Sequence, residues 1–75
     1  MKVYILFSCD AWKSTASMSI INVFSSLDKV REAIADEVKG GGMEFDEGVA
    51  EHFGGDVRGI NNGLTYGNVE EWEVQ

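Results

Sequence analysis

The segment from residue 19 to residue 38, SIINVFSSLDKVREAIADEV, constrains the fold most, because it changes from a strand-like to a helical pattern. In its second half, apolar residues recur at steps of three and four, as one buried face of a helix requires. These residues are Leu27, Val30, Ile34 and Val38. Ser25 is the expected N-cap, with Asp28 three residues later, and Lys39 followed by the glycines 40–42 should end the helix. The segment therefore predicts a strand that runs through a cap into an amphipathic helix.

Three stretches predict strands, and one of them, residues 18–24, is the strand of the segment above. Residues 2–8, KVYILFS, form a continuous apolar run, which is typical of a central strand covered on both faces. In residues 18–24 the alternation is imperfect, and a bulge near Ile20 and Ile21 would bring both sets of apolar side chains onto the core. The closing segment places its large apolar residues on one parity and most of its acids on the other, which predicts a half-buried strand with an acidic outer face. The apolar residues are Leu64, Tyr66, Trp72 and Val74.

A second, shorter helix is predicted around Phe45, Val49 and Phe53, which recur at steps of four, with Asp46 as N-cap and the glycines 54–55 as its end. Residues 56–63 fit an irregular or helical turn, and a hairpin around the Asn-Gly pair at 62–63 remains the alternative. The expected fold is α+β: a three-stranded antiparallel sheet in ββα(α)β order, with one main helix and a short second helix packed on one face. Residues 1–75 should form a single small domain.

Cysteine content and the N-terminus limit the class of protein. Cys9 is the only cysteine, which excludes an intrachain disulfide and a multi-cysteine zinc site and favours a reducing compartment. The first ten residues hold an apolar run that is too short for the core of a signal peptide or for a membrane span. We therefore expect a cytoplasmic protein without a membrane contact.

The net charge of −7 is located in one half of the chain. Residues 1–42 hold five acids and five bases, whereas residues 43–75 hold eight acids and only Arg58 as a base. Binding to phosphates needs clustered lysine and arginine, so direct nucleic-acid binding is not expected.

Three segments together resemble a group of small proteins of unknown function from bacteria of the Firmicutes type and their phages. The segments are KVYILFS, INVFSSLDKVREAI and TYGNVEEWEV. The group's strand-to-cap junction, "GVFSS", matches residues 23–26, with Asn22 where relatives often have glycine. Its closing "Y-x-IEE-x-E" strand matches Tyr66, Val69, Glu70, Glu71 and Glu73. The resemblance covers about half of the chain and implies the fold and an origin in a phage or other mobile element, but no activity.

No residue pattern predicts an enzyme, a cofactor or a metal site. His52 is the only histidine, and nothing in the sequence brings it near Cys9 to form a nucleophilic pair. A cation site built from Asp46, Glu47, Glu51 and His52 would lack the loop spacing of a calcium site, so these side chains are read as a solvated helix face. The expected catalytic and metal-ligating residues are therefore none.

The loop after the first strand is the main candidate for an interaction, because a tryptophan in a hydroxyl-rich loop is typical of a binding hot spot. Alternatively, Trp12 folds back over the edge of the sheet and completes the small core. The candidate residues are Trp12, Lys13, Ser14, Thr15, Met18 and Ile20. The candidate acidic surface consists of Glu44, Asp46, Glu47, Glu51, Glu70, Glu71 and Glu73.

Two functions follow as hypotheses. The first is a non-enzymatic module that binds another protein through the Trp12 loop or an exposed strand edge. The second is an acidic inhibitor whose carboxylates imitate nucleic-acid phosphates in the basic groove of a host enzyme. A homodimer is also expected, with the second strand or the loop before it as the contact and the acidic closing strand on the outside, because residues 17–26 carry no charge that would protect an exposed edge.

Overall fold

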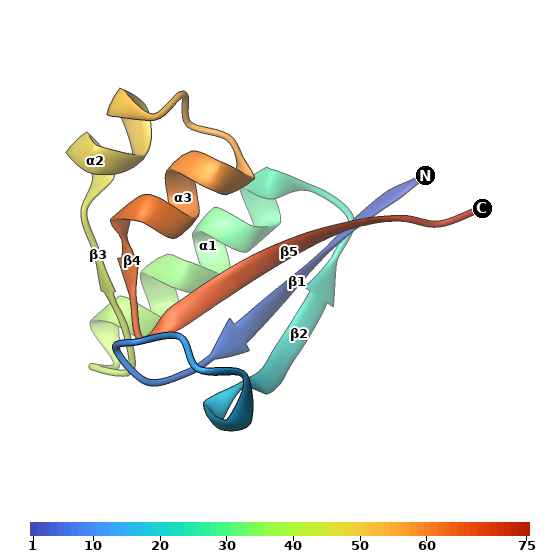
Figure 1. Ribbon diagram of the computed structural model, residues 1–75. Helices are drawn as coiled ribbons and strands as arrows, with labels where there is room; N and C mark the ends of the chain where they lie inside the picture. The colour runs from blue at the N-terminus through green and yellow to red at the C-terminus, as the bar shows by residue number, and fades with distance from the viewer.

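The computed structural model describes residues 1–75 and shows a mixed α+β protein (Figure 1). Its helices and strands are β1 (Lys2–Ser8), β2 (Ser19–Phe24), α1 (Leu27–Lys39), β3 (Glu44–Phe45), α2 (Glu47–His52), α3 (Val57–Gly63), β4 (Leu64–Thr65) and β5 (Gly67–Glu73). The main sheet is antiparallel with strand order β2-β1-β5, and β3 pairs with β4 in a separate two-stranded sheet. The α+β class and the three-stranded sheet are thus confirmed, whereas the element order is ββαβααββ.

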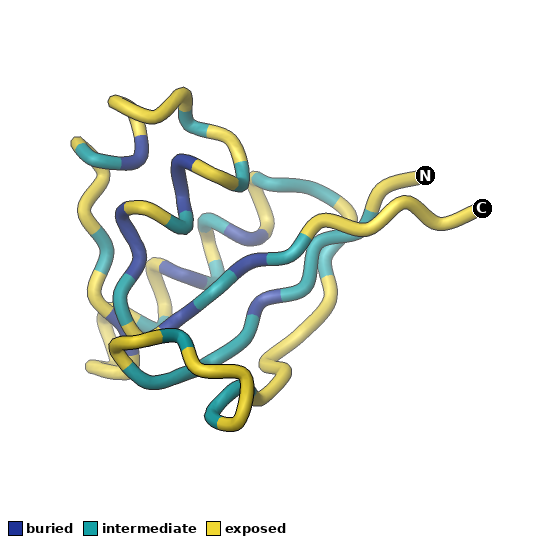
Figure 2. Tube along the Cα trace, viewed as in Figure 1, coloured by how far each residue is buried: buried dark blue, intermediate teal, exposed yellow.

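One face of the main sheet carries the hydrophobic core. Leu6 at the centre of β1 pairs with Val69 of β5, and both are buried against the helices. The core cluster is completed by Val30, Ile34, Met43, Ile60 and Leu64. Figure 2 shows these buried positions gathered between the helices and the strands. The prediction that β1 is covered on both faces is wrong. Leu6 and Tyr4 contact the core cluster, whereas Val3, Ile5 and Phe7 on the other face do not.

Helix α1 forms where expected but begins one residue later. Ser26, not Ser25, is the N-cap, and its hydroxyl accepts a hydrogen bond from the backbone N–H of Lys29 at 3.3 Å. Val30 and Ile34 are buried as predicted. Val38 is 39% exposed, because it lines a surface groove beside Phe45 of β3 instead of packing on the main sheet.

Strand β2 contains the predicted bulge, but the bulge does not have the predicted effect. Leu6 pairs with Asn22 and the next residue, Phe7, pairs with Ile20, so Ile21 is the extra residue. Ile20 is nevertheless 62% exposed and Val23 50% exposed. The register explains this, because it sets both residues opposite side chains of β1 that face away from the helices.

The closing segment is divided at Tyr66, which has a positive φ of 67°. This left-handed residue ends β4 and starts β5 with the opposite parity, so Val69 faces the core. The predicted parity is therefore wrong for β5: Trp72 is 55% exposed, and Tyr66 and Val74 are exposed as well.

Helices α2 and α3 pack closely through glycines of α3. Asp46 caps α2 as predicted, and its Oδ1 accepts a hydrogen bond from Val49 N at 3.1 Å. Residues 56–63 are helical and do not form a hairpin. Phe53, which was expected on the inner face of α2, lies at the C-terminal end of α2 and is exposed. A Cβ on Gly59 would lie 2.5 Å from the carbonyl oxygen of Ala50, so only glycine permits this approach.

The two edges of the main sheet differ. The side-chain amide of Asn61 in α3 donates to Val69 O at 2.8 Å and accepts from Val69 N at 2.7 Å. At this point the Asn61 side chain forms the two hydrogen bonds that a further strand would otherwise form with the outer edge of β5. On the other side of the sheet, β2 has exposed residues from Ser19 to Val23.

Candidate interaction surface

The side of the main sheet away from the helices carries a set of apolar side chains. Directly opposed residues in antiparallel strands share a face, and the register pairs Val3 with Trp72, Ile5 with Val23 and Phe7 with Ile20. We call these residues the open sheet face. It comprises Val3, Ile5, Phe7, Ile20, Val23 and Trp72. All three strands contribute, so the surface is continuous across the sheet.

The outer strands supply the most exposed members of the open sheet face. Ile20, Val23 and Trp72 are each at least half exposed, whereas Val3, Ile5 and Phe7 are half-buried between them. The indole Nε1 of Trp72 donates a hydrogen bond to Glu70 Oε1 at 3.0 Å, which orients the ring. Contiguous apolar surface of this kind marks interaction sites in monomeric proteins.

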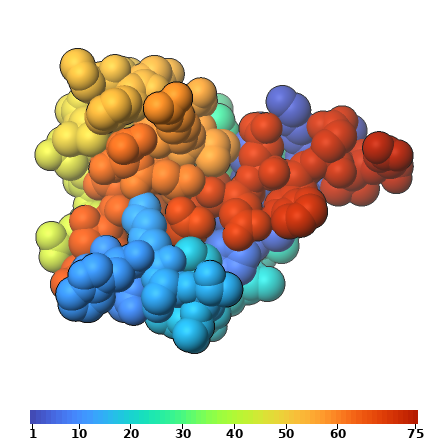
Figure 3. Space-filling model, viewed as in Figure 1, coloured from blue at the N-terminus to red at the C-terminus, as the bar shows by residue number.

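The Trp12 loop is organised by Asp10. Its Oδ1 accepts hydrogen bonds from Trp12 N at 3.1 Å and Ser14 N at 3.0 Å, and its Oδ2 accepts one from the Ser14 hydroxyl at 2.8 Å. The Ser14 backbone N–H and hydroxyl, followed by Trp12 N–H, lower the pKa of the Asp10 carboxyl. Trp12 itself is 86% exposed and does not cover the sheet. The loop, in blue, lies at the lower surface of the molecule in Figure 3. Its turn is held by Asp10 and leaves the Trp12 indole exposed to solvent.

Lys13 has a different role from its neighbour Trp12. It adopts a positive φ of 54°, and its Nζ donates a hydrogen bond to Asn61 O at 2.6 Å. Burial of this ammonium lowers the pKa of Lys13. The side chain therefore fastens the loop to α3. Among the other loop candidates, Thr15 is exposed in a 3₁₀ turn and Met18 is half-buried.

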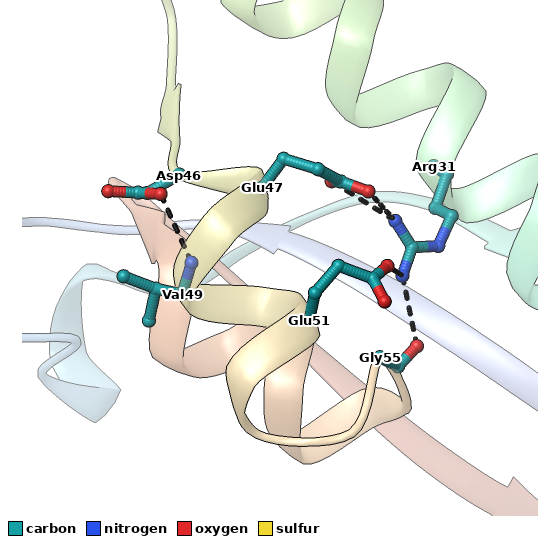
Figure 4. A network of polar contacts seen from close by, with 6 residues as sticks. All are labelled: Arg31, Asp46, Glu47, Val49, Glu51 and Gly55. Carbon is teal, nitrogen blue, oxygen red and sulfur yellow. Dashed lines mark hydrogen bonds and ion pairs between the residues drawn. The ribbon is translucent and has the colours of Figure 1, made fainter.

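The acidic candidates lie in two separate regions. One group is on β3 and α2, and the other on β5, toward the opposite end of the ribbon in Figure 1. In the first group, Glu47 and Glu51 lie 2.9 Å and 3.8 Å from Arg31 nitrogens (Figure 4). Arg31 also donates to Gly55 O at 3.0 Å, so this guanidinium joins α1 to α2 and the loop after it.

The acids on β5 also have partners within the chain. Glu71 lies 3.7 Å from Lys2 Nζ, and Glu73 lies 3.3 Å from the amino group of Met1. These pairs are exposed and contribute little to stability. Many of the candidate carboxylates therefore make contacts within the chain.

No group of three histidine, cysteine, aspartate or glutamate side chains is close enough to hold a metal ion. Asp46 is engaged as a helix cap, and His52 packs edge-on against Phe53 with ring centroids 5.1 Å apart. No helix is both long and apolar enough to cross a membrane.

Cys9 follows β1 and is half-buried, and its backbone N–H donates to Tyr66 O at 3.1 Å. Burial raises the pKa of its thiol, and the nearby Lys13 ammonium only partly opposes this effect. The thiolate, which is the reactive form, is therefore scarce at neutral pH. We expect slow labelling by a thiol reagent in the native protein, and a rate that keeps rising with pH beyond the range of an ordinary cysteine.

The same protein in denaturant is the control for Cys9 and should react fast at the same pH. Labelling kinetics followed by mass spectrometry give both rates. Equal rates in the native and unfolded protein near neutral pH would contradict the shielded thiol and reopen a reactive role for Cys9.

Comparisons with known proteins add no relatives: no family model matches the chain, and no curated protein or solved structure matches significantly. The open sheet face therefore stands on geometry alone. Ile20 and Trp12 were singled out from the sequence, whereas Val23 and Trp72 were assigned to the core. The absence of charge in residues 17–26 indicated a contact at this strand, but it did not show that Val23 lies on the exposed side.

Proposed function

We propose that this chain is a non-enzymatic protein-interaction module that binds its partner through the open sheet face, with Trp12 as an additional anchor. The observation that carries the proposal is the exposure of Ile20, Val23 and Trp72 on one continuous side of the sheet. Exposed tryptophans and aliphatic side chains on a fixed backbone supply binding energy with little loss of conformational entropy. The module needs no cofactor for this role.

The acidic residues of β5 indicate the composition of the partner's surface. Glu70 lies beside Trp72 on the same side of the sheet, opposite Ile5, and Glu71 and Glu73 follow in the same strand. A complementary partner has an apolar centre with lysine or arginine on its rim, because acids at that rim would be repelled. Cytoplasmic location and an origin in a phage or another mobile element belong to the same proposal, and they rest on the single cysteine and on the VFSS and EEWE motifs.

An acidic inhibitor that imitates nucleic acid is the second candidate. Three acids within four residues of β5, namely Glu70, Glu71 and Glu73, favour it. The dependence of binding on salt concentration distinguishes the two functions. Binding of the inhibitor to a basic groove would weaken steeply as ionic strength rises, whereas binding through the open sheet face should persist.

Selection from a displayed peptide library tests the proposed function without a known partner. We expect apolar peptides with basic flanks to be enriched, and the double variant Trp72→Ser, Val23→Ser to bind them at least about tenfold more weakly, since both anchors are lost. Val38→Ser is the matched control, because Val38 is an exposed apolar residue on a different surface. Equal affinity of the double variant and the wild type, measured by calorimetry, would contradict the proposal.

A further inference from the structure

We propose that strand β2 pairs antiparallel with β2 of a second copy of this chain, so that two main sheets join into one continuous sheet. The inference rests on the proposed function in one respect: the paired strands would extend the open sheet face across both copies. It differs in the groups that bind, because the backbone edge of β2, rather than the side chains of the open sheet face, makes the contact.

The main sheet has two edges, and only one is blocked. On β5, the Asn61 carboxamide occupies both the N–H and the carbonyl of Val69. On β2, the N–H of Val23 donates to the side chain of the adjacent Asn22 at 2.8 Å. A contact between neighbouring residues can be exchanged for a carbonyl of an incoming strand without a change of fold. The β2 edge is thus open to pairing by β-strand addition.

Charge makes a second copy the fitting occupant of this edge. At a net charge of −7, two copies repel each other over much of their surfaces. Residues 17–26 carry no charge, so contact along β2 brings no like charges together. Contact along β5 would instead oppose Glu70, Glu71 and Glu73 of both copies. Of the two edges of the main sheet, the uncharged strand β2 is the one at which two copies of this chain can meet without opposing acids.

A two-fold axis suits this contact. Antiparallel pairing of a strand with its own copy is an isologous interface, in which the same residues serve both sides. Ile20 and Val23 of each copy then extend the same apolar surface, so the open sheet faces of the two copies become adjacent. A strand edge is small beside the roughly 1,200 to 2,000 Å² of a stable protein interface. We therefore expect a reversible dimer with a dissociation constant in the micromolar range.

Sedimentation of the full chain from micromolar to millimolar concentration is the test. The wild type should shift from the monomer mass of 8.2 kDa toward twice that mass as concentration rises. Ile20→Lys should stay monomeric throughout, because a lysine on an edge strand disfavours pairing with another strand. Trp72→Lys, on the open sheet face but on β5, should dimerise like the wild type while it loses peptide binding.

Hydrogen exchange of the wild type gives an independent measurement that needs no variant. The Val23 amide should exchange more slowly at high concentration, whereas the Val69 amide, held by Asn61, should not change. A wild type that stays at 8.2 kDa, or an Ile20→Lys variant that still dimerises, would overturn the dimer. Either result would leave the peptide-binding test of the proposed function untouched, and loss of peptide binding alone would leave the dimer intact.

Discussion

The variant Ile34→Asp should fail to fold. Ile34 is only 1% exposed and lies in the centre of the core cluster between α1 and the main sheet. An aspartate there would have no partner, and a buried unpaired polar or charged group costs several kcal/mol. A domain of this size has a total stability of only about 3 to 5 kcal/mol, so the whole margin is lost. Circular dichroism should show no cooperative melting.

Ala35→Asp is the matched control for Ile34→Asp, because it puts the same charge one residue later on the exposed side of α1. Its effect should be below about 1 kcal/mol, which is the difference in helix propensity. A cooperative transition in Ile34→Asp close to that of the control would mean that this side of α1 faces solvent or a partner.

The variant Gly63→Ala should lower the melting temperature by at least about 10 °C, equivalent to about 2 to 3 kcal/mol. A Cβ at this position would overlap the carbonyl oxygen of Asp46 and lie 3.3 Å from Ala50 N. Both neighbours are backbone atoms of the segment that forms α2, so no side-chain rotation can relieve the contact. The hydrogen bond from Asp46 N to Gly63 O, at 2.8 Å, ties the two segments at the same point.

Gly40→Ala is the control for Gly63→Ala. Gly40 has an ordinary φ of −80° at the end of α1, and its added Cβ would meet the nearest atom at 3.5 Å. We expect a change within about 0.5 kcal/mol, as for most surface positions. If thermal melts show similar losses for both variants, the close packing of α2 on α3 is not the reason that glycine occupies position 63.

Local signals in the sequence were enough to predict the elements with strong periodicity or caps. The helical stripe at Val30 and Ile34 and the cap at Asp46 depend on residues a few positions apart, and both were predicted correctly. The cap of α1 was misplaced by one residue, because Ser25 and Ser26 are chemically equal and only the tertiary path of β2 decides between them.

The errors concern which face of a strand is covered. A continuous apolar run such as KVYILFS is typical of a doubly covered strand, and the short chain provides helices for only one face of the sheet. The parity of β5 depends on the left-handed Tyr66, a conformation that a tyrosine rarely adopts and that no local rule predicts. These two features created the open sheet face, so Ile20 was the only member of that face that the sequence predicted as an interaction residue; Trp12 was predicted separately, in the loop after β1.

The central position of β1 has a consequence for the order of events during synthesis. Its neighbours are β2, which follows it closely in the chain, and β5, with Lys2 opposite Glu73. The first part of this sheet to emerge from the ribosome is therefore the pair of strands β1 and β2. An isolated two-stranded hairpin is only marginally stable in water. Since β5 is translated last among these elements, the nascent chain must remain without its completed core until that strand emerges, and chaperones have the longest access to the apolar residues of β1.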